Sequence, residues 1–478
     1  MQARNAFLLI LITACGGGRS GVQPMPPGPA PTPIAPAPAG PTAPPPGSAA
    51  APAVAATGNQ VLDGTPAIPD ELRQRLEPYL NTRSAGISDI AEDGSSILVT
   101  TRFGNALEVH LVTRPGGDRT QLTFAQEPTR GGTFVPGSKR SLIFTRDVGG
   151  NEQYQLYRLD LDGARTTLLT DGKSRNESAL WSPDGKKLAW GSTRRNGRDF
   201  DVWVSDGTSA ASAVQVVEGK GEWLPVDFSH DGKKLLVLES ISINHARMYL
   251  ADLDKKTVTN ITPGDKPVAH RDGALAPDGK RAYITSDRDG EFVQLYEVDL
   301  AKNSWRSLTA NIPWNVEEIE LSHDGRNLAF IVNEGGFSRV YLVDTRSRKA
   351  AKLAAVPDGL ASGLVFARKA PVLGVTLYGG TRTGDAYTYD LRKRKLVRWT
   401  ASEMGGLDTA RLQEPTLIEF TTFDGAKIPA FYHRPKGNGP FPVVVSIHGG
   451  PEGQARPAFN PTVQYLVGER GVAVLEPN

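Results

Sequence analysis

The stretch WSPDGKKLAW, residues 181–190, decides the fold of this chain, because variants of it return along most of the sequence. FSHDGKKLLVL begins at Phe228, LAPDGKRAYIT at Leu275 and LSHDGRNLAFI at Leu321. Each copy places an Asp-Gly or Pro-Gly pair between two apolar runs, which is typical of a tight turn joining two antiparallel strands. The turns begin 43 to 48 residues apart, at Asp93, Pro136, Asp184, Asp231, Asp278 and Asp324.

Two further patterns keep the same period. A second apolar segment follows each turn, as in YQLYRLD at 154–160 and VQLYEVD at 293–299, and a short strand then often ends in Leu-Thr, as at Leu308-Thr309. A degenerate seventh copy, LVFARKAPVLGVTLY at 364–378, continues the series. Seven periods between residues 85 and 404 predict a seven-bladed β-propeller of four-stranded sheets, in which neighbouring blades cover each other's apolar faces. A series of β-sandwiches is the competing architecture.

The composition excludes some classes of partner and site. Lys and Arg number 54 against 52 Asp and Glu, and the one basic run, residues 392–395, is expected on a solvated strand end, so nucleic acid is not expected as a partner. With Cys15 as the only cysteine, an internal disulfide and a cysteine-based metal cluster are excluded. The following histidines lie on different predicted blades without metal-ligand spacing, and no metal is expected: His110, His230, His245, His270 and His323. The following aromatic residues recur in register and are expected to pack between blades: Trp181, Trp190, Trp203, Tyr249, Tyr296 and Tyr341.

The amino-terminal residues predict export and an anchor. Arg4 and the apolar run AFLLILITA at 6–14 form a signal peptide over residues 1–15 that is too short to span a membrane. ITAC at 12–15 resembles a bacterial lipobox, which implies lipidation of Cys15 and a lipid-anchored, periplasmic protein of the bacterial cell envelope. Gly16 after the cysteine resembles the pattern of outer-membrane lipoproteins. An ordinary signal peptide with an incidental cysteine is the alternative.

A tether and a short helix are expected next. Residues 16–60 are rich in Pro and Ala, with 13 prolines between Pro24 and Pro52, and are expected to extend as a spacer without a core. Residues 61–84 form a lead-in, with a helix expected over 68–80 because Leu72, Leu76 and Leu80 recur at helical spacing.

The pattern changes in residues 405–478. A hairpin turning at Asp424-Gly425 is followed by an apolar run at 443–447, a glycine-rich loop, a helix within 462–470 and a strand within 471–478. An apolar strand, a glycine loop, a helix and another strand predict a doubly wound α/β layout in which the strand at 443–447 is buried.

The motifs HGGPEGQ at 448–454, RPAFNPTVQYL at 456–466 and GVAVLEPN at 471–478 closely resemble the prolyl oligopeptidase family of serine peptidases, on its acylaminoacyl peptidase and dipeptidyl aminopeptidase branch. The propeller repeats resemble those of this family and of TolB-type proteins. The resemblance implies that Gly450, with Gly449 beside it, supplies an oxyanion-hole amide. His448 is not expected to be the catalytic base, because in this fold the base follows the nucleophile in the chain. A tight turn without a catalytic role is the alternative reading of the two glycines.

The 478 residues contain no G-x-S-x-G nucleophile motif. The expected fold is therefore an all-β seven-bladed β-propeller followed by the truncated start of an α/β-hydrolase domain. The implied activity is hydrolysis of oligopeptides without a cofactor, and a chain lacking the Ser, Asp and His of the triad is expected to be inactive. Glu317 and Glu318 lack the surrounding motif that would mark a site for a substrate amino terminus. The alternative function is a non-catalytic envelope lipoprotein whose propeller binds proteins or peptides.

Overall fold

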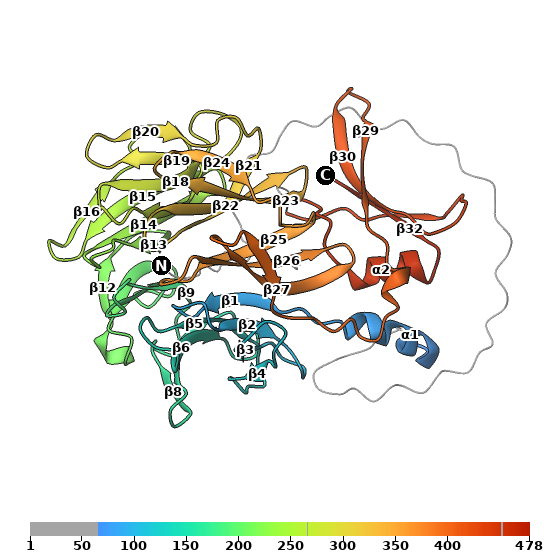
Figure 1. The fold of residues 1–478 in the computed structure, drawn as a ribbon, viewed down its shortest axis with the longest axis horizontal. Helices are drawn as coiled ribbons and strands as arrows, with labels where there is room; N and C mark the ends of the chain where they lie inside the picture. The colour runs from blue at the N-terminus through green and yellow to red at the C-terminus, as the bar shows by residue number, and fades with distance from the viewer. Residues whose placement is uncertain (1–65, 265, 451–452) are drawn as a thin grey trace, which may run out of the picture. The chain divides into compact units, whose positions relative to one another are not determined.

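The computed structural model describes residues 66–264, 266–450 and 453–478 (Figure 1). The predicted signal peptide, the lipidation site Cys15 and the tether at 16–60 lie outside the described residues. Within the described part of the chain, no helix is long and apolar enough to cross a membrane.

Seven four-stranded antiparallel sheets, here called blades 1 to 7, follow one another along the chain. Blades 1 to 4 consist of β1 (Gly86–Ile90), β2 (Ile97–Thr101), β3 (Glu108–Val112), β4 (Thr120–Gln121); β5 (Thr129–Phe134), β6 (Ser141–Arg146), β7 (Gln155–Asp160), β8 (Arg165–Leu168); β9 (Asn176–Trp181), β10 (Leu188–Ser192), β11 (Asp201–Ser205), β12 (Val214–Val217); and β13 (Glu222–Phe228), β14 (Lys234–Ser242), β15 (His245–Asp252), β16 (Thr257–Asn260). Blades 5 to 7 consist of β17 (His270–Leu275), β18 (Arg281–Ser286), β19 (Gln294–Asp299), β20 (Ser304–Ser307); β21 (Asn315–Leu321), β22 (Asn327–Glu334), β23 (Phe337–Asp344), β24 (Lys349–Lys352); and β25 (Leu360–Phe366), β26 (Val372–Gly379), β27 (Arg382–Asp390), β28 (Lys395–Arg398). The seven-bladed propeller is thus confirmed, and each blade is one continuous segment of chain.

The Asp-Gly turns explain why the repeat folds as it does. In blade 3, Asp184 Oδ1 accepts hydrogen bonds from the Ser182 hydroxyl at 2.7 Å and the Lys186 amide at 3.1 Å. Gly185 follows with φ of 72°, a left-handed conformation that glycine adopts without steric cost. Ser229 and Asp231 make the same hydroxyl-to-carboxylate bond in blade 4, so the turn is encoded within a few residues of sequence.

The repeated threonine also has a local role. The Thr309 hydroxyl accepts a hydrogen bond from the Leu295 amide at 3.0 Å, at the place where the outermost strand of blade 5 ends. Thr262 does the same for the Met248 amide in blade 4 at 2.8 Å. In each of these blades the threonine hydroxyl thus satisfies a backbone amide of the third strand that lies just past the last residue paired with the fourth strand.

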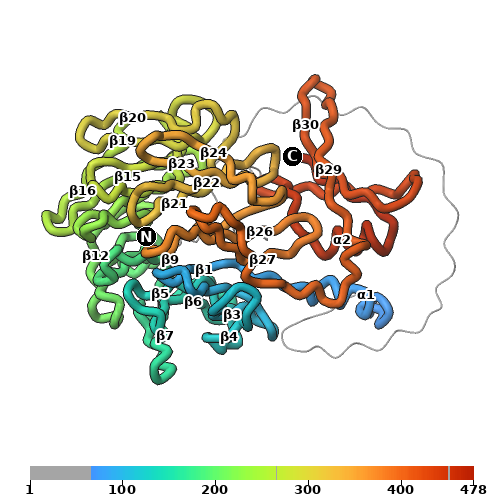
Figure 2. The backbone as a smooth tube through the Cα atoms, in the orientation of Figure 1, coloured from blue at the N-terminus to red at the C-terminus, as the bar shows by residue number. Residues whose placement is uncertain are grey.

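Packing between blades forms the core. Trp181 and Trp190 of blade 3 are almost fully buried against Ile143 of blade 2, which confirms the expected packing role of these aromatic residues. Blades 1 and 7 close the ring, because β1 packs against β25, β26 and β27 (Figure 2). The Ile87 amide also donates to the Thr376 hydroxyl at 2.9 Å. Side-chain packing and a few hydrogen bonds, such as that from the Ala85 amide to the Gly384 carbonyl oxygen at 3.0 Å, therefore join the first and last blades without a shared sheet.

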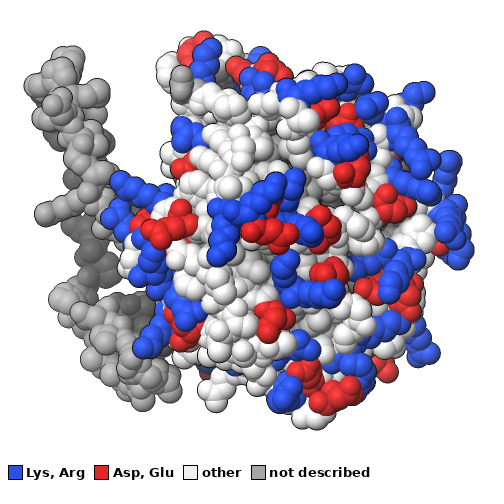
Figure 3. All heavy atoms as spheres, turned by 90° about the vertical axis from the view of Figure 1, so that its left-hand side faces the viewer, with Lys and Arg blue, Asp and Glu red and all other residues white. Residues whose placement is uncertain are grey.

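Residues on either side of the propeller add small elements. The helix α1 (Asp70–Leu80) precedes blade 1, and short 3-10 turns occur at η1 (Ala210–Ser212) and η2 (Thr409–Arg411). The helix expected over 68–80 is thus present; within it Tyr79 is buried, with 3% exposure, whereas Leu80 is 58% exposed. Basic and acidic side chains intermingle over the face in Figure 3, in keeping with the formal net charge of +2.

The carboxyl-terminal residues form an eighth sheet of order β29-β30-β32-β31. The hairpin β29 (Thr416–Thr421) and β30 (Lys427–His433) turns at Asp424-Gly425 as predicted, and β32 (Ala473–Pro477) continues the sheet. The strand β31 (Val443–Val445) runs parallel to β32, and α2 (Pro461–Gly468) connects them. The prediction that the apolar strand at 443–447 is buried was wrong. Val443 is 53% and Val445 is 55% exposed, because β31 is an edge strand and no described element covers it.

Candidate active-site region

The glycine-rich loop begins directly after β31, where the resemblance places an oxyanion hole. Gly449 and Gly450 are both exposed, and Gly450 has φ of 121°, which favours glycine at this position. His448 Nδ1 lies 3.1 Å from the carbonyl oxygen of Gly449, so that Nδ1 is the donor in this contact. A side chain at Gly453 would overlap that same carbonyl group. The loop is therefore compact, and its assignment as one side of an oxyanion hole stays a prediction.

Arg456, a few residues further on, connects this segment to blade 6. Its Nη1 lies 3.1 and 2.9 Å from the two carboxylate oxygens of Glu317, and its Nε donates to the carbonyl oxygen of Gly336 at 2.9 Å. A fourth bond joins Nη2 to the Ser338 hydroxyl at 3.1 Å. One guanidinium group thus uses all three of its nitrogens to hold the loop after HGG on the propeller.

The helix α2 provides a second connection. Its amino terminus is capped by the Asn460 side chain, which accepts from the amides at the first turn. Within the helix, Gln464 is buried, and its side-chain nitrogen donates to the carbonyl oxygens of Gly380 in blade 7 and of Gln413, at 2.9 and 2.8 Å. Val463 and Val467 pack on Val474 of β32. The helix therefore joins the eighth sheet and blade 7 through one polar and one apolar face.

Glu317 and Glu318 have different structural partners. Glu318 is buried, and its carboxylate accepts hydrogen bonds from the amides of Gly363 and Leu364 in blade 7. Burial raises the pKa of Glu318 to about 8. Glu317 is paired with Arg456. Neither carboxylate faces a site free of protein partners, so a role in binding a substrate amino terminus has no support in this geometry.

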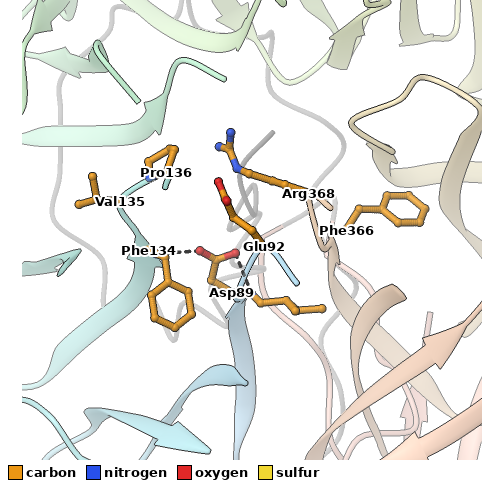
Figure 4. Close-up of a pocket in the computed structure, with 8 residues that line it drawn as sticks. Asp89, Glu92, Phe134, Val135, Pro136, Phe366 and Arg368 are labelled. Carbon is orange, nitrogen blue, oxygen red and sulfur yellow. Dashed lines mark hydrogen bonds between the residues drawn. The ribbon is translucent and has the colours of Figure 1, made fainter. Parts of the chain in front are cut away.

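A cluster of ionisable residues lies at the centre of the propeller, at the end that carries the Asp-Gly turns (Figure 4). Asp89 accepts from the amides of Ile90 at 2.8 Å and Phe134 at 2.7 Å, and burial raises its pKa to about 6. Arg368 of blade 7 reaches across to donate to the carbonyl oxygen of Pro183 in blade 3 at 2.7 Å. Burial lowers the pKa of Arg368, while the carboxylates around it, Asp89 first among them, oppose that shift. This arrangement ties blades 1, 2, 3 and 7 together around the axis.

Two of the scattered histidines also meet in this part of the propeller. The rings of His230 in blade 4 and His323 in blade 6 have centroids 4.7 Å apart, and burial lowers the pKa of His323 to about 4. Sequence reasoning missed this contact, although both residues directly precede an Asp-Gly pair and so hold equivalent positions in their blades. Pro183 and Arg368 hold the same position in blades 3 and 7. Among the described residues, no group of three or more His, Cys, Asp or Glu side chains is placed to hold a metal.

Arg456 was also missed as a functional residue. The sequence signal available was its position, eight residues after His448 and within a conspicuous motif, but its partners lie on blade 6, more than a hundred residues earlier. Cys15, the predicted lipidation site, lies outside the described residues. Of the predicted site residues, the structure therefore places only Gly449 and Gly450, and it adds Arg456, which follows them in the chain and binds blade 6.

Comparisons with known proteins agree with this architecture. Residues 137–359 match the TolB beta propeller domain. A dipeptidyl-peptidase 5 of Porphyromonas endodontalis is 25% identical over 182 residues, which are 37% of this chain and 24% of that protein. A prolyl endopeptidase of known structure shares the fold with a TM-score of 0.71 at 15% identity, over 86% of this chain and 63% of that chain. A puromycin-hydrolyzing peptidase of Mycobacterium tuberculosis gives a TM-score of 0.69 at 17% identity, over 84% and 67% of the two chains.

The fold follows from these matches and the geometry: a TolB-like seven-bladed propeller is followed by a four-stranded sheet with one helix, α2, between two of its strands. The structures that share this fold are peptidases of the prolyl oligopeptidase and puromycin hydrolase type. The match covers about a quarter of the curated dipeptidyl-peptidase and under two thirds of the prolyl endopeptidase.

Proposed function

We propose that this protein is a serine peptidase that hydrolyses oligopeptides. The observation that carries the proposal is the HGG loop at the carboxyl end of β31, held on the propeller by Arg456. In α/β-hydrolases a backbone amide from this loop stabilises the oxyanion of the tetrahedral intermediate. Gly450, with Gly449 beside it, is the proposed source of that amide.

The remaining chemical groups would come from elsewhere. The 478 residues contain no G-x-S-x-G motif, so we place the nucleophile, acid and base of the triad outside them. The propeller would cap the site and admit oligopeptides while excluding folded proteins. The chain by itself is expected to be inactive.

The proposed location is the bacterial cell envelope. The lipobox-like residues at 12–15 support lipidation of Cys15, and the proline-rich spacer supports a tether between lipid and propeller. Metabolic labelling with a fatty acid should mark the protein, and Cys15→Ala should abolish the label. Equal labelling of the variant would contradict lipidation at this residue.

A fluorophosphonate probe tests the peptidase proposal. The purified 478-residue chain should remain unlabelled, whereas a product of the reading frame beyond codon 478 that carries G-x-S-x-G should be labelled at that serine. Replacing that serine with alanine provides the control. Stoichiometric labelling of the 478-residue chain would overturn the placement of the nucleophile.

A binding function is the second candidate, supported by the match of residues 137–359 to the TolB beta propeller domain. In that case the propeller would bind protein or peptide partners without hydrolysis. A stop codon directly after codon 478, in several independent isolates, would favour this function over the peptidase.

A further inference from the structure

Two turns in adjacent blades carry a concentration of basic residues. Residues 344–349 (DTRSRK) join β23 to β24 in blade 6, and residues 390–395 (DLRKRK) join β27 to β28 in blade 7. Seven of these twelve residues are basic and two are acidic, which gives a net charge of +5, whereas the whole chain carries only +2. The rest of the chain is therefore net acidic, and we call residues 344–349 and 390–395 the basic rim.

The fold of these turns does not require basic side chains. Asp344 Oδ1 accepts hydrogen bonds from the amides of Arg346 and Ser347 at 3.1 and 2.8 Å, so the aspartate shapes the turn. Asp299 makes the same bonds in blade 5, where the corresponding residues 299–304 (DLAKNS) contain a single lysine. The charge of the basic rim is thus a feature of blades 6 and 7 that the turn geometry leaves unexplained.

The basic side chains of the rim are all exposed, and most of them have no ion pair. Arg348 Nη2 lies 2.9 Å from a carboxylate oxygen of Glu297, and Lys393 Nζ lies 3.6 Å from Asp390. The other five make no ion pair with a described residue: Arg346, Lys349, Arg392, Arg394 and Lys395. An anionic surface can therefore approach five cationic groups without breaking an existing ion pair.

The basic rim lies at the end of the blades opposite to the loops that hold Arg456 and α2. Arg456 donates to Gly336 in the loop between β22 and β23, and Gln464 of α2 donates to Gly380 in the loop between β26 and β27. Because each blade is antiparallel, the turn after its third strand lies at the opposite end from the loop before that strand. A surface bound at the rim would thus leave the end that carries Arg456 uncovered.

The composition of the rim fits a membrane surface better than a nucleic acid. Its twelve residues include no aromatic side chain on which a base could stack. Lys and Arg side chains close to an anionic bilayer are attracted by its negative surface potential, and clusters of about four to eight are typical of segments that bind anionic lipids. The five unpaired cations of the rim fall within this range.

We propose that the basic rim docks the propeller on the surface of a bilayer that contains anionic phospholipids. This inference rests on the proposed location in the cell envelope, where a lipid on Cys15 and the proline-rich spacer would keep the propeller within reach of a membrane. A lipid chain and a polybasic surface together hold a protein on a bilayer more firmly than either does alone. With the rim on the bilayer, the end that carries Arg456 faces the aqueous space from which oligopeptides arrive.

Partition of the full chain onto vesicles tests the proposal. Cys15→Ala, which cannot be lipidated, would be sedimented with vesicles of phosphatidylcholine alone or of phosphatidylcholine mixed with phosphatidylglycerol. The apolar residues 6–14 are the same in every sample, so the difference between the two kinds of vesicle reports charge. We expect at least about tenfold stronger partition onto the anionic vesicles, and loss of most of this difference at high salt, which screens the surface potential.

A charge-neutralised variant locates the contact. In the Cys15→Ala background, four unpaired residues at equivalent positions of the two turns would be changed together: Arg346→Gln, Lys349→Gln, Arg392→Gln and Lys395→Gln. The matched control removes four exposed basic residues at the other end of the blades: Lys173→Gln, Arg198→Gln, Lys220→Gln and Arg271→Gln. The rim variant should lose at least about tenfold in partition onto anionic vesicles, whereas the control should remain close to the parent. Thermal melting verifies that both variants are folded.

Each contrary outcome has a defined meaning. Equal partition onto neutral and anionic vesicles, or equal losses in the folded rim variant and the folded control, would overturn docking through the rim. Tighter binding to a single-stranded oligonucleotide or to polyglutamate than to anionic vesicles would also overturn it, since the partner would then be another polyanion. Fatty-acid labelling of Cys15 is measured separately, so lipidation can fail while the rim binds anionic bilayers, and the reverse.

Discussion

Nη1 of Arg456 lies 2.9 Å and 3.1 Å from the two carboxylate oxygens of Glu317, and this ion pair connects residues 139 positions apart. Both side chains are largely shielded from solvent, with 12% and 30% exposure. Charged hydrogen bonds in such a setting contribute more than surface pairs, because water competes less with them. The ion pair, together with the bonds to Gly336 and Ser338, is therefore expected to hold the loop after HGG against blade 6.

Arg456→Ala should loosen this loop without unfolding the propeller. Loss of the charged bonds should lower the local stability of residues 453–478 by about 2 kcal/mol, which corresponds to roughly 30-fold faster hydrogen exchange where exchange follows local opening. Arg456→Lys keeps the charge but lacks the three-nitrogen fork, so we expect only partial recovery. Hydrogen exchange monitored by mass spectrometry measures the effect.

Arg470→Ala is the matched control, because Arg470 is an exposed arginine in the same segment. Its exchange rates should remain those of the parent chain. If Arg456→Ala and Arg470→Ala gave equal rates throughout residues 453–478, the contact would have no role in fixing the loop.

The buried carboxyl of Glu318 predicts a loss of stability on going from about pH 6.5 to pH 8. Its folded pKa of about 8 lies above the ordinary glutamate pKa of 4.5, so in this window the folded protein holds a proton that the unfolded chain has released. Stability therefore falls as pH rises, by up to about 2 kcal/mol. The folded pKa of Asp89, about 6, and those of His270 and His323, about 4, place their transitions at lower pH.

Thermal melting between pH 6.5 and pH 8 measures this effect. The parent chain should show a falling midpoint, whereas Glu318→Gln, which cannot ionise, should show a flatter profile. Glu291→Gln changes an exposed glutamate of blade 5 and should retain the parent slope. A slope that persists in Glu318→Gln would assign the pH dependence to another group.

How much the sequence can predict depends on the distance over which an interaction acts. Ser182, Asp184 and Gly185 build their turn from adjacent residues, so the repeat predicts the blades and their number. The contact of His230 with His323 could also have been predicted by following one repeat position around the ring. Arg456 and Glu317 are different, because no local pattern states which arginine meets which carboxylate across separate sheets.

The exposed strand β31 illustrates another limit. The run of valines at 443–445 correctly predicts an apolar strand, since β-branched residues favour extended backbone. Hydrophobicity alone does not specify which element covers a strand, and here β31 is an edge strand that no described element covers.

Two glycines of blade 3 provide a test of close packing between blades. Gly207 and Gly197 both have a left-handed φ, 69° and 75° respectively. A Cβ at Gly207 would overlap the indole ring of the buried Trp181, whereas a Cβ at Gly197 would meet nothing within 4 Å. Alanine at either position therefore carries a similar backbone cost, and only alanine at Gly207 adds a steric conflict.

Gly207→Ala should accordingly be less stable than Gly197→Ala by about 1–3 kcal/mol, the usual range for overpacking a core. Both variants carry the free-energy cost of placing alanine at a left-handed φ, so the difference in stability between them reports the contact with Trp181. Parallel thermal and urea denaturation, followed by tryptophan fluorescence, measures the midpoints of both variants. Equal midpoints would mean that the indole moves aside at little cost, and the packing of Trp181 between blades 2 and 3 would then be looser than its burial implies.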